Sequence, residues 1–384
     1  MEPRVVRLRA LSSDGTREVV RTPALQISLE HPDERVARFV LGPARELLGA
    51  PVVLLGTDEV GTVEVEVLGE DLAAGLRWRT ISPAADRALR VPWARPGWYV
   101  ATCDVIDAAL GEIGRRRTGP VRQARHWSIS AIMEVPTDSG SLWFKQVPGL
   151  FAHEGRLSAW LHERVPGAVP KPVYVGPDWW LAEAFGPESR EVSGMDHFQA
   201  LGMLQRESVG HGAELLALGC PDRRLPLLLP ELFAASGRPL LTEEQWSALE
   251  RSRPQLEHAV EVLAGAGLPD TLVHGDFHAG NVRGSDVGWT IYDWTDGCLS
   301  HPLLDLQPAW SLHAWTGATF DAGVEAWWPA HRCAPQIWSA AACVGLAHQL
   351  VSHLRITAAV ETAAGQTWRE ESRRWADRLL VMLA

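Results

Sequence analysis

A chain of 384 residues is longer than one typical domain, and its 46% hydrophobic content is enough to bury two or three cores. The formal net charge of -11 argues against nucleic acid or an anionic membrane surface as the main partner. Five scattered cysteines, odd in number and without a C-x-x-C pair, indicate neither a disulfide framework nor a zinc site. With no basic-then-apolar leader and no apolar run of membrane-spanning length, the sequence predicts a soluble, cytoplasmic protein.

The N-terminal third, residues 1–120, predicts a small α+β domain. Alternation of valine with glutamate at 62–67 is typical of a half-buried strand. An arginine run at 115–117 opens a linker, which we interpret as a solvated boundary rather than a phosphate contact. A lid, a homodimer surface and simple packing are the roles considered for this domain. Further strands are expected at 4–8, 19–21 and 51–55, and helices at 36–48 and 98–113.

From residue 121 the pattern changes to β-type runs, with strands expected at 126–130, 131–136 and 141–147. The last of these carries Lys145, and Glu154 opens a helical segment soon after. Lys145 is one of only two lysines in a chain that otherwise uses arginine. A compact ammonium retained here favours a functional role, whereas a surface lysine passing over apolar neighbours is the alternative.

The most informative stretch is 272–294, L-V-H-G-D-F-H-A-G-N-V-R-G-S-D-V-G-W-T-I-Y-D-W. An apolar run leads into His274 and Asp276, Asn281 follows five residues later, and a predicted strand at 289–292 ends on Asp293. Asn281 is the only asparagine in the chain. Two carboxylates and an amide on adjacent loop ends suit a divalent metal on a polyphosphate and proton acceptance from a hydroxyl.

The pattern H-G-D-x-x-x-x-N followed by I-Y-D-W resembles the aminoglycoside phosphotransferase family of small-molecule kinases. The resemblance implies an α+β, bilobal, protein-kinase-like fold. Its β-rich N-lobe and hinge would occupy 121–186 and its helical C-lobe 187–384, with 1–120 as an extra domain. Helices are expected at 196–207, 212–218, 226–235 and 242–264, with further helices from 309 to the C-terminus.

The resemblance also assigns roles around ATP and Mg²⁺. Asp276 would orient and deprotonate the acceptor hydroxyl, while Asn281 and Asp293 would bind magnesium bridging the phosphates. Lys145 would neutralise phosphate charge and be held by Glu154.

Other parts of the nucleotide site depart from the protein-kinase pattern or stay open. The expected phosphate turn at 128–131 contains no glycine, so contacts would come from backbone N–H groups and the hydroxyls of Ser128 and Ser130. The strand at 179–186 would offer main-chain groups to the adenine, and a core strand with a turn is the alternative. The residues that would make these adenine contacts are Glu183, Ala184 and Phe185.

Four further side chains near the motif are candidates for substrate contact or structure. His274 is expected to brace the loop by hydrogen bonding. His278 could lie near the acceptor or pack beside Phe277. Asp305 is interpreted as a buried cap for the catalytic loop, and Asp296 as a contact to magnesium or substrate.

The predicted function is transfer of the γ-phosphate of ATP to a hydroxyl of a small molecule. The resemblance does not select among an aminoglycoside, a sugar, choline or a similar metabolite. No motif indicates which residues contact the acceptor. Candidates for a cationic acceptor are the acidic residues Glu231, Asp321 and Glu325. Candidates for stacking are the aromatic residues Trp310, Trp315, Trp327, Trp328 and Trp338. The alternative is a nucleotide-binding pseudokinase or regulatory protein that works through its N-terminal domain. A protein kinase is disfavoured because no Ala-Pro-Glu segment follows Asp293.

Overall fold

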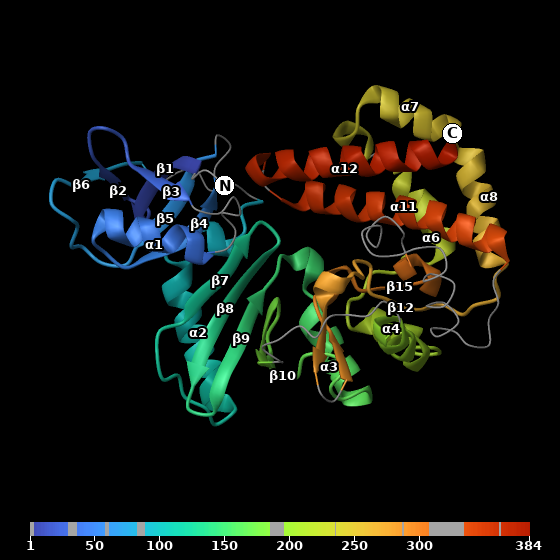
Figure 1. The fold of residues 1–384 in the computed structure, drawn as a ribbon, viewed down its shortest axis with the longest axis horizontal. Helices are drawn as coiled ribbons and strands as arrows, with labels where there is room; N and C mark the ends of the chain where they lie inside the picture. Colours follow the sequence, from blue (N-terminus) through green and yellow to red (C-terminus); the bar gives the residue numbers. More distant parts are fainter. Residues whose placement is uncertain are drawn as a thin grey trace. The chain divides into compact units, whose positions relative to one another are not determined.

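The computed structural model describes residues 4–29, 37–57, 61–82, 89–184, 196–234, 236–285, 288–306, 334–360 and 362–384. The chain divides into two compact units. The first comprises Met1–Leu150, Trp179–Ala182 and Ala359–Thr367, and the second comprises the remaining segments. Both units mix helices and strands or strand ribbons, which confirms the predicted α+β class (Figure 1). The finer division into three domains at residues 120 and 186 stays a prediction.

The N-terminal part of the first unit is a six-stranded sheet with strand order β4-β5-β1-β2-β6, and β3 also pairs with β1. Helix α1, Ala37–Leu48, lies against this sheet and buries Val40, Leu41 and Leu48 in a core shared with the strands (Figure 1). Strands β3 and β6 were not predicted from the sequence. The strands are β1 Arg4–Ser12, β2 Arg17–Val20, β3 Gln26–Leu29, β4 Val52–Thr57, β5 Val63–Val67 and β6 Arg77–Thr80.

Strand β5 is buried on both faces, so the expectation of a half-buried strand is wrong. Its valines face the α1 core, as the alternation predicts. The opposite face, which carries the two glutamates, is buried as well. Their carboxylates accept hydrogen bonds from other parts of the unit. Glu64 accepts from Arg9 at 2.9 Å and from Arg90 at 2.7 Å, and Glu66 accepts the backbone N–H of Gly97 at 2.9 Å.

The strands expected to hold nucleotide follow in the same unit, in the order β11-β9-β8-β7. The prediction of a first strand at 126–130 is wrong, since β7 ends at Trp127 and Ser130 already belongs to β8. Trp127 pairs with Ser130, which leaves a turn of only two residues. The predictions at 131–136 and 141–147 are confirmed within a residue or so. The strands are β7 Arg122–Trp127, β8 Ser130–Thr137, β9 Gly140–Gln146 and β11 Trp179–Glu183.

Two short elements connect the N-terminal sheet to these strands. They are the 3-10 turn η1, Pro92–Ala94, and helix α2, Trp98–Glu112, which confirms the predicted second helix. The arginine run after α2 is less solvated than expected. Arg117 donates to both carboxylate oxygens of Asp107, at 2.8 and 2.5 Å, and its backbone bridges to Thr137.

A buried amide joins the N-terminal sheet to β7. The side chain of Gln123 accepts from the backbone N–H of Leu54 at 2.7 Å and donates to the Leu54 carbonyl at 3.0 Å. Beside it, His126 contacts the Leu55 carbonyl through Nε2 at 3.2 Å and the Gln123 amide through Nδ1 at 3.1 Å. Burial lowers the pKa of His126 to about 4, so the ring is neutral. A neutral ring with its proton on Nε2 satisfies both contacts.

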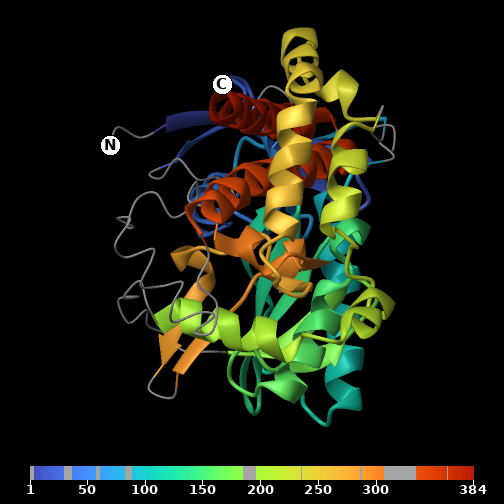
Figure 2. The same cartoon turned by 90° about the vertical axis from the view of Figure 1, so that its right-hand side faces the viewer.

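The described part of the second unit is mostly helical. The prediction of a single helix at 242–264 is wrong, because α7 and α8 are separated at Ser252. Pro254 has no N–H to continue the α7 ladder and favours a new first turn. Helices α11 and α12 pack side by side, and Trp375 donates to His353 between them at 3.2 Å (Figures 1 and 2). The elements are α3 Glu154–Arg164, β10 Pro172–Val175, α4 Asp196–Glu207, α5 Gly212–Ala217, α6 Leu225–Leu232, α7 Glu243–Arg251, α8 Arg253–Ala264, α11 Pro335–Ala359 and α12 Thr362–Leu383.

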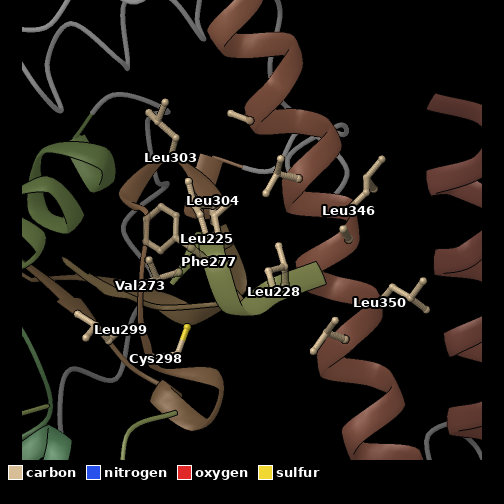
Figure 3. Packing of buried hydrophobic residues seen from close by; sticks show 14 of the residues in the cluster. Leu225, Leu228, Val273, Phe277, Cys298, Leu299, Leu303, Leu304, Leu346 and Leu350 are labelled. Carbon is tan, nitrogen blue, oxygen red and sulfur yellow. The ribbon is translucent and has the colours of Figure 1, made fainter. Parts of the chain in front are cut away.

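The apolar core of the second unit includes buried side chains of the motif region, 272–294, and of the strand that follows it. Leu228 of α6 and Leu350 of α11 belong to the same apolar cluster as Val273, Phe277 and Cys298 (Figure 3). Burying large apolar side chains on three elements fixes the backbone on which the polar loop residues stand. Within the described ranges, none of the helices combines the length and apolar composition needed to span a lipid bilayer.

We predict that Glu64→Gln lowers the free energy of unfolding of the first unit by about 2 to 3 kcal/mol, because it removes the buried carboxylate shared by two arginines. Urea unfolding followed by tryptophan fluorescence checks this. Glu257→Gln, which opens the exposed Arg253–Glu257 pair, is the control and is expected to change stability by less than about 0.5 kcal/mol. Equal effects of the two variants would contradict the role of Glu64.

A second prediction concerns acid. The pKa of His126 is depressed in the folded state, so its contribution to stability is complete above about pH 6.5 and is lost as pH falls towards 4. Lowering the pH from 7.5 to 5 should cost the first unit about 2 kcal/mol through this group. Urea unfolding at both pH values should show a smaller pH dependence in His126→Gln, and an unchanged one in the exposed control His258→Gln.

Candidate active site

Two strand ribbons bring the motif residues to one place. Strand β12, Thr271–Val273, pairs with β15, Cys298–Ser300, and β13, Val282–Ser285, pairs with β14, Gly288–Ile291. Val273 lies opposite Cys298, and Val282 lies opposite Ile291. The loops 274–281 and 292–297 therefore run side by side from one ribbon to the other. Asp276 and Asn281 stand on the first loop, and Asp293 stands on the second.

Asn281 is fixed by hydrogen bonds on three sides. Its side-chain N–H donates to the Asp276 carbonyl at 3.0 Å and lies 3.4 Å from a carboxylate oxygen of the same residue. Its backbone N–H donates to His278, and its carbonyl accepts from Tyr292 at 3.0 Å. Because the amide nitrogen faces Asp276, the amide oxygen faces the other way and can serve as a metal ligand.

Asp293 has an unusual backbone conformation. Its φ of 66° makes it the one non-glycine residue with positive φ among the described residues. Aspartate tolerates this left-handed region better than most residues, and such strain is concentrated at functional sites. Thr295 donates to one carboxylate oxygen of Asp293 at 3.0 Å and so orients the side chain.

His274 connects the two loops and is fully buried. Its Nδ1 accepts the backbone N–H of Asp276 at 3.3 Å, and its Nε2 lies 3.0 Å from the carbonyl of Tyr292. An N–H can only donate and a carbonyl can only accept, so the ring is neutral with its proton on Nε2. Burial lowers the pKa of His274, which favours the same neutral form. His274 therefore holds the two loops together through hydrogen bonds.

Asp305 is the buried acceptor for the start of the first loop. One carboxylate oxygen accepts the backbone N–H of His274, and the other accepts that of Gly275, both at 2.8 Å. Gln205 of α4 adds a third hydrogen bond at 2.8 Å. Burial raises the pKa of Asp305 to about 7, while these donors act in the opposite direction. The carboxyl group thus accepts both backbone N–H groups at the start of the loop.

Position 275 requires glycine for two reasons, its backbone conformation and the lack of room for a side chain. Its φ is 82°, and a Cβ at this position would lie 2.6 Å from the carbonyl oxygen of Asp296. Any side chain would therefore separate the two loops. The Gly275 carbonyl accepts a hydrogen bond from Gln349 of α11, so Asp305 and Gln349 hold the residue from its two ends.

Two further candidates lie next to Asp276. His278 Nε2 is 3.7 Å from an Asp276 oxygen, and this carboxylate raises the pKa of His278. Burial within the protein, and then the negative charge of Asp276, raise the pKa of Asp296 to about 6. A carboxyl that titrates near neutrality beside Asp276 can exchange a proton or contact a substrate.

The remaining predicted residues are distributed over both units. Lys145 lies on β9, nearly buried, opposite Ile132 of β8. Glu154 is fully buried as the first residue of α3. The Glu183 N–H already donates to the Lys171 carbonyl at 2.9 Å. Ser128, Ser130 and Lys145 belong to the first unit, and Glu154, Glu183 and Ala184 to the second. Phe185, Asp321, Glu325, Trp310, Trp315, Trp327 and Trp328 lie outside the described residues.

Sequence reasoning missed the residues that hold the loops from outside the motif. Gln349 and Ser352 contact the loop region from α11, and Gln205 does so from α4. The available signal was a stripe of polar residues, 348–349 and 352–353, on an otherwise apolar predicted helix. Gln205 stood on an ordinary amphipathic segment and gave no such signal.

In the part of the chain that the structure describes, no three His, Cys, Asp or Glu side chains form a metal cluster. Magnesium does not need one, because it is commonly bound by one or two protein ligands together with substrate phosphates. Asn281 and Asp293 present an amide oxygen and a carboxylate, which are ligand types that magnesium accepts.

The chain was compared with known proteins. It matches the model of the phosphotransferase enzyme family over residues 137–338, more than half of its length. The structure of macrolide 2'-phosphotransferase MphH from Brachybacterium faecium is similar, with 16% identity, a TM-score of 0.51, and coverage of 71% of this chain and 97% of that one. A choline/ethanolamine kinase family protein from Mesorhizobium loti has 14% identity and a TM-score of 0.48, over 74% of this chain and 99% of that one. No curated protein matches.

These findings confirm the family resemblance carried by the H-G-D-x-x-x-x-N pattern. They also confirm the protein-kinase-like fold, to which the N-terminal strands β1–β6 are an addition. The chain belongs to the phosphotransferase enzyme family and is a small-molecule kinase.

Proposed function

We propose that this protein transfers the γ-phosphate of ATP to a hydroxyl group of a small molecule. The observation that carries the proposal is the pair of adjacent loops that presents Asp276, Asn281 and Asp293, each held by hydrogen bonds from its neighbours. Phosphoryl transfer depends mainly on positioning and charge stabilisation, and these braced side chains suit both.

Each residue has a chemical task in this proposal. Asp276 accepts the proton of the acceptor hydroxyl and orients its oxygen towards the phosphate. Asn281 and Asp293 would hold Mg²⁺, which when bound supplies positive charge to the phosphate oxygens. The fit is supported by the fixed Asn281 amide, whose oxygen is turned away from Asp276.

The remaining nucleotide contacts are also proposals. Lys145 would bind phosphate and Glu154 would hold it, while the turn at Ser128 and Ser130 would contact the phosphates. The adenine would meet main-chain groups at 183–185, where the Glu183 N–H is already used by Lys171. A small molecule with a hydroxyl group is the acceptor class. A macrolide belongs in the test panel because the similar MphH structure is a macrolide phosphotransferase.

A pseudokinase is not favoured, because every charged or amide group of the motif is present and braced. A homodimer and a cytoplasmic location stay predictions.

The proposal predicts that Asp276→Asn lowers the rate of phosphoryl transfer at least about 100-fold, since it removes the proton acceptor. The binding of ATP should persist. ³¹P nuclear magnetic resonance with a panel of hydroxylated acceptors, together with calorimetric titration of ATP, measures both. Asp270→Asn, an exposed aspartate just before β12, is the matched control and should keep full activity. Transfer at the wild-type rate by Asp276→Asn would refute the assignment.

A second prediction tests the buried cap. In Asp305→Asn, either orientation of the amide turns its N–H₂ towards the backbone N–H of His274 or of Gly275, because each carboxylate oxygen accepts one of them. The lost acceptor should destabilise the loop by about 2 kcal/mol and lower kcat at least about tenfold. Kinetics and the affinity for ATP measure the effect. Asp377→Asn is the control, because its amide oxygen can still accept from Gln245. Wild-type kcat in Asp305→Asn would contradict the role.

A further inference from the structure

The turn between β7 and β8 is held without glycine. Its two residues, Ser128 and Ile129, do not have positive φ, since Asp293 alone among the described non-glycine residues does. Two-residue hairpin turns usually need positive φ and therefore glycine or asparagine. Here Trp127 donates from its indole to the Ser130 hydroxyl at 2.6 Å and closes the turn from the side. The turn therefore depends on side-chain support rather than on backbone freedom.

The N-terminal extension, by which we mean the segment 1–120, supplies a second support at the same turn. Trp93 of η1 is fully buried, and its indole N–H donates to the Trp127 carbonyl at 2.6 Å. That carbonyl is the last one of β7 before the turn. A buried hydrogen bond at this point fixes where β7 stops and where the turn begins.

A second tryptophan of the extension holds the strand that carries the lysine. Trp98, the first residue of α2, donates to the side chain of Gln146 at 2.9 Å. Gln146 follows Lys145 on β9 and lies opposite Ala131 of β8. The rings of Trp93 and Trp98 contact each other edge to face, with centroids 6.5 Å apart. The two supports thus form one aromatic unit.

This aromatic unit is itself anchored in the N-terminal sheet. The buried carboxylate of Glu66 on β5 accepts the N–H of Gly97, the N-cap of α2. A negative charge at this end of a helix is favourable. Tyr99 donates to the Val121 carbonyl at 2.6 Å, where the chain enters β7. The extension is therefore tied to the nucleotide strands through several independent contacts.

We propose that the N-terminal extension is a working part of the nucleotide site, and that Trp93 and Trp98 are positioning residues for the phosphates of ATP. Trp93 fixes the glycine-free turn, and Trp98 fixes the strand position next to Lys145. The extension takes over a function that glycines perform in a glycine-rich loop. This inference rests on the proposed function, because it assumes that the turn and Lys145 meet the phosphates.

The test compares ATP with adenosine, which has the same base and sugar but no phosphates. Full-length Trp93→Phe and Trp98→Phe keep an aromatic ring and lose the N–H donor. Each should raise the Kd for ATP about fivefold, as expected for one lost hydrogen bond, and leave the Kd for adenosine within about twofold of wild type. Calorimetric titration measures both ligands.

Two controls separate positioning from folding. Trp78→Phe removes an indole hydrogen bond to the Glu70 carbonyl in the same unit, away from β7, β8 and β9, and should not change either Kd. Glu64→Gln destabilises the N-terminal sheet without touching the tryptophans, so it shows what lost stability alone does. Trp98 is only partly buried, so Trp98→Phe stays informative if Trp93→Phe does not fold.

The outcomes are distinct. Wild-type binding of ATP by both tryptophan variants overturns this inference and leaves the proposed function intact. An equal loss for ATP and adenosine also overturns it, because that result indicates a structural role alone. If the wild-type protein binds no ATP, the proposed function fails, and this inference fails with it.

Discussion

The loop 274–281 depends on one buried carboxyl group. Asp305 accepts two consecutive backbone N–H groups, and no neutral side chain of similar size can offer two acceptors in the same places. Once these amides are fixed, Gly275 must take a left-handed conformation against Asp296, and Asp276 follows in a defined direction. His274, Asn281 and Asp293 then complete the contacts between the two loops. Burying this carboxyl group is unfavourable, and the three hydrogen bonds that it accepts offset part of that cost while they fix the loop.

The N-terminal extension and strands β7 to β9 are joined by directional hydrogen bonds as well. Polar groups pair with matching donors and acceptors: Gln123 with the Leu54 backbone, Tyr99 with the Val121 carbonyl, and Trp93 with the Trp127 carbonyl. Such contacts are specific in direction, unlike apolar packing, and they resist sliding of one layer over the other. These contacts link residues outside the matched family segment to β7 and to β9, the strand that carries Lys145.

The motif and most elements could be predicted from the sequence, because local patterns determine them. Asp276, Asn281 and Asp293 were found by their spacing, and α1, α2 and α4 by apolar periodicity. The contacts that depend on distant parts of the chain could not be predicted. Nothing local to β5 indicates that Arg9 and Arg90 bind Glu64, and nothing local to the motif indicates the contact of Gln349. The break between the helices at Ser252 could have been predicted from Pro254, but the apolar periodicity on both sides of it favoured one continuous helix.

The amide of Gln123 has a consequence beyond joining two layers. Strand β4 is an edge strand of its sheet, and an edge strand normally offers unpaired backbone groups to which another polypeptide can add a strand. At Leu54 the Gln123 side chain occupies both the donor and the acceptor, as a neighbouring strand would. The extension separated from residue 123 would lose this cover and leave the backbone N–H and carbonyl of Leu54 open to a strand of another polypeptide. Gln123 therefore closes part of the β4 edge only while both segments belong to one folded unit.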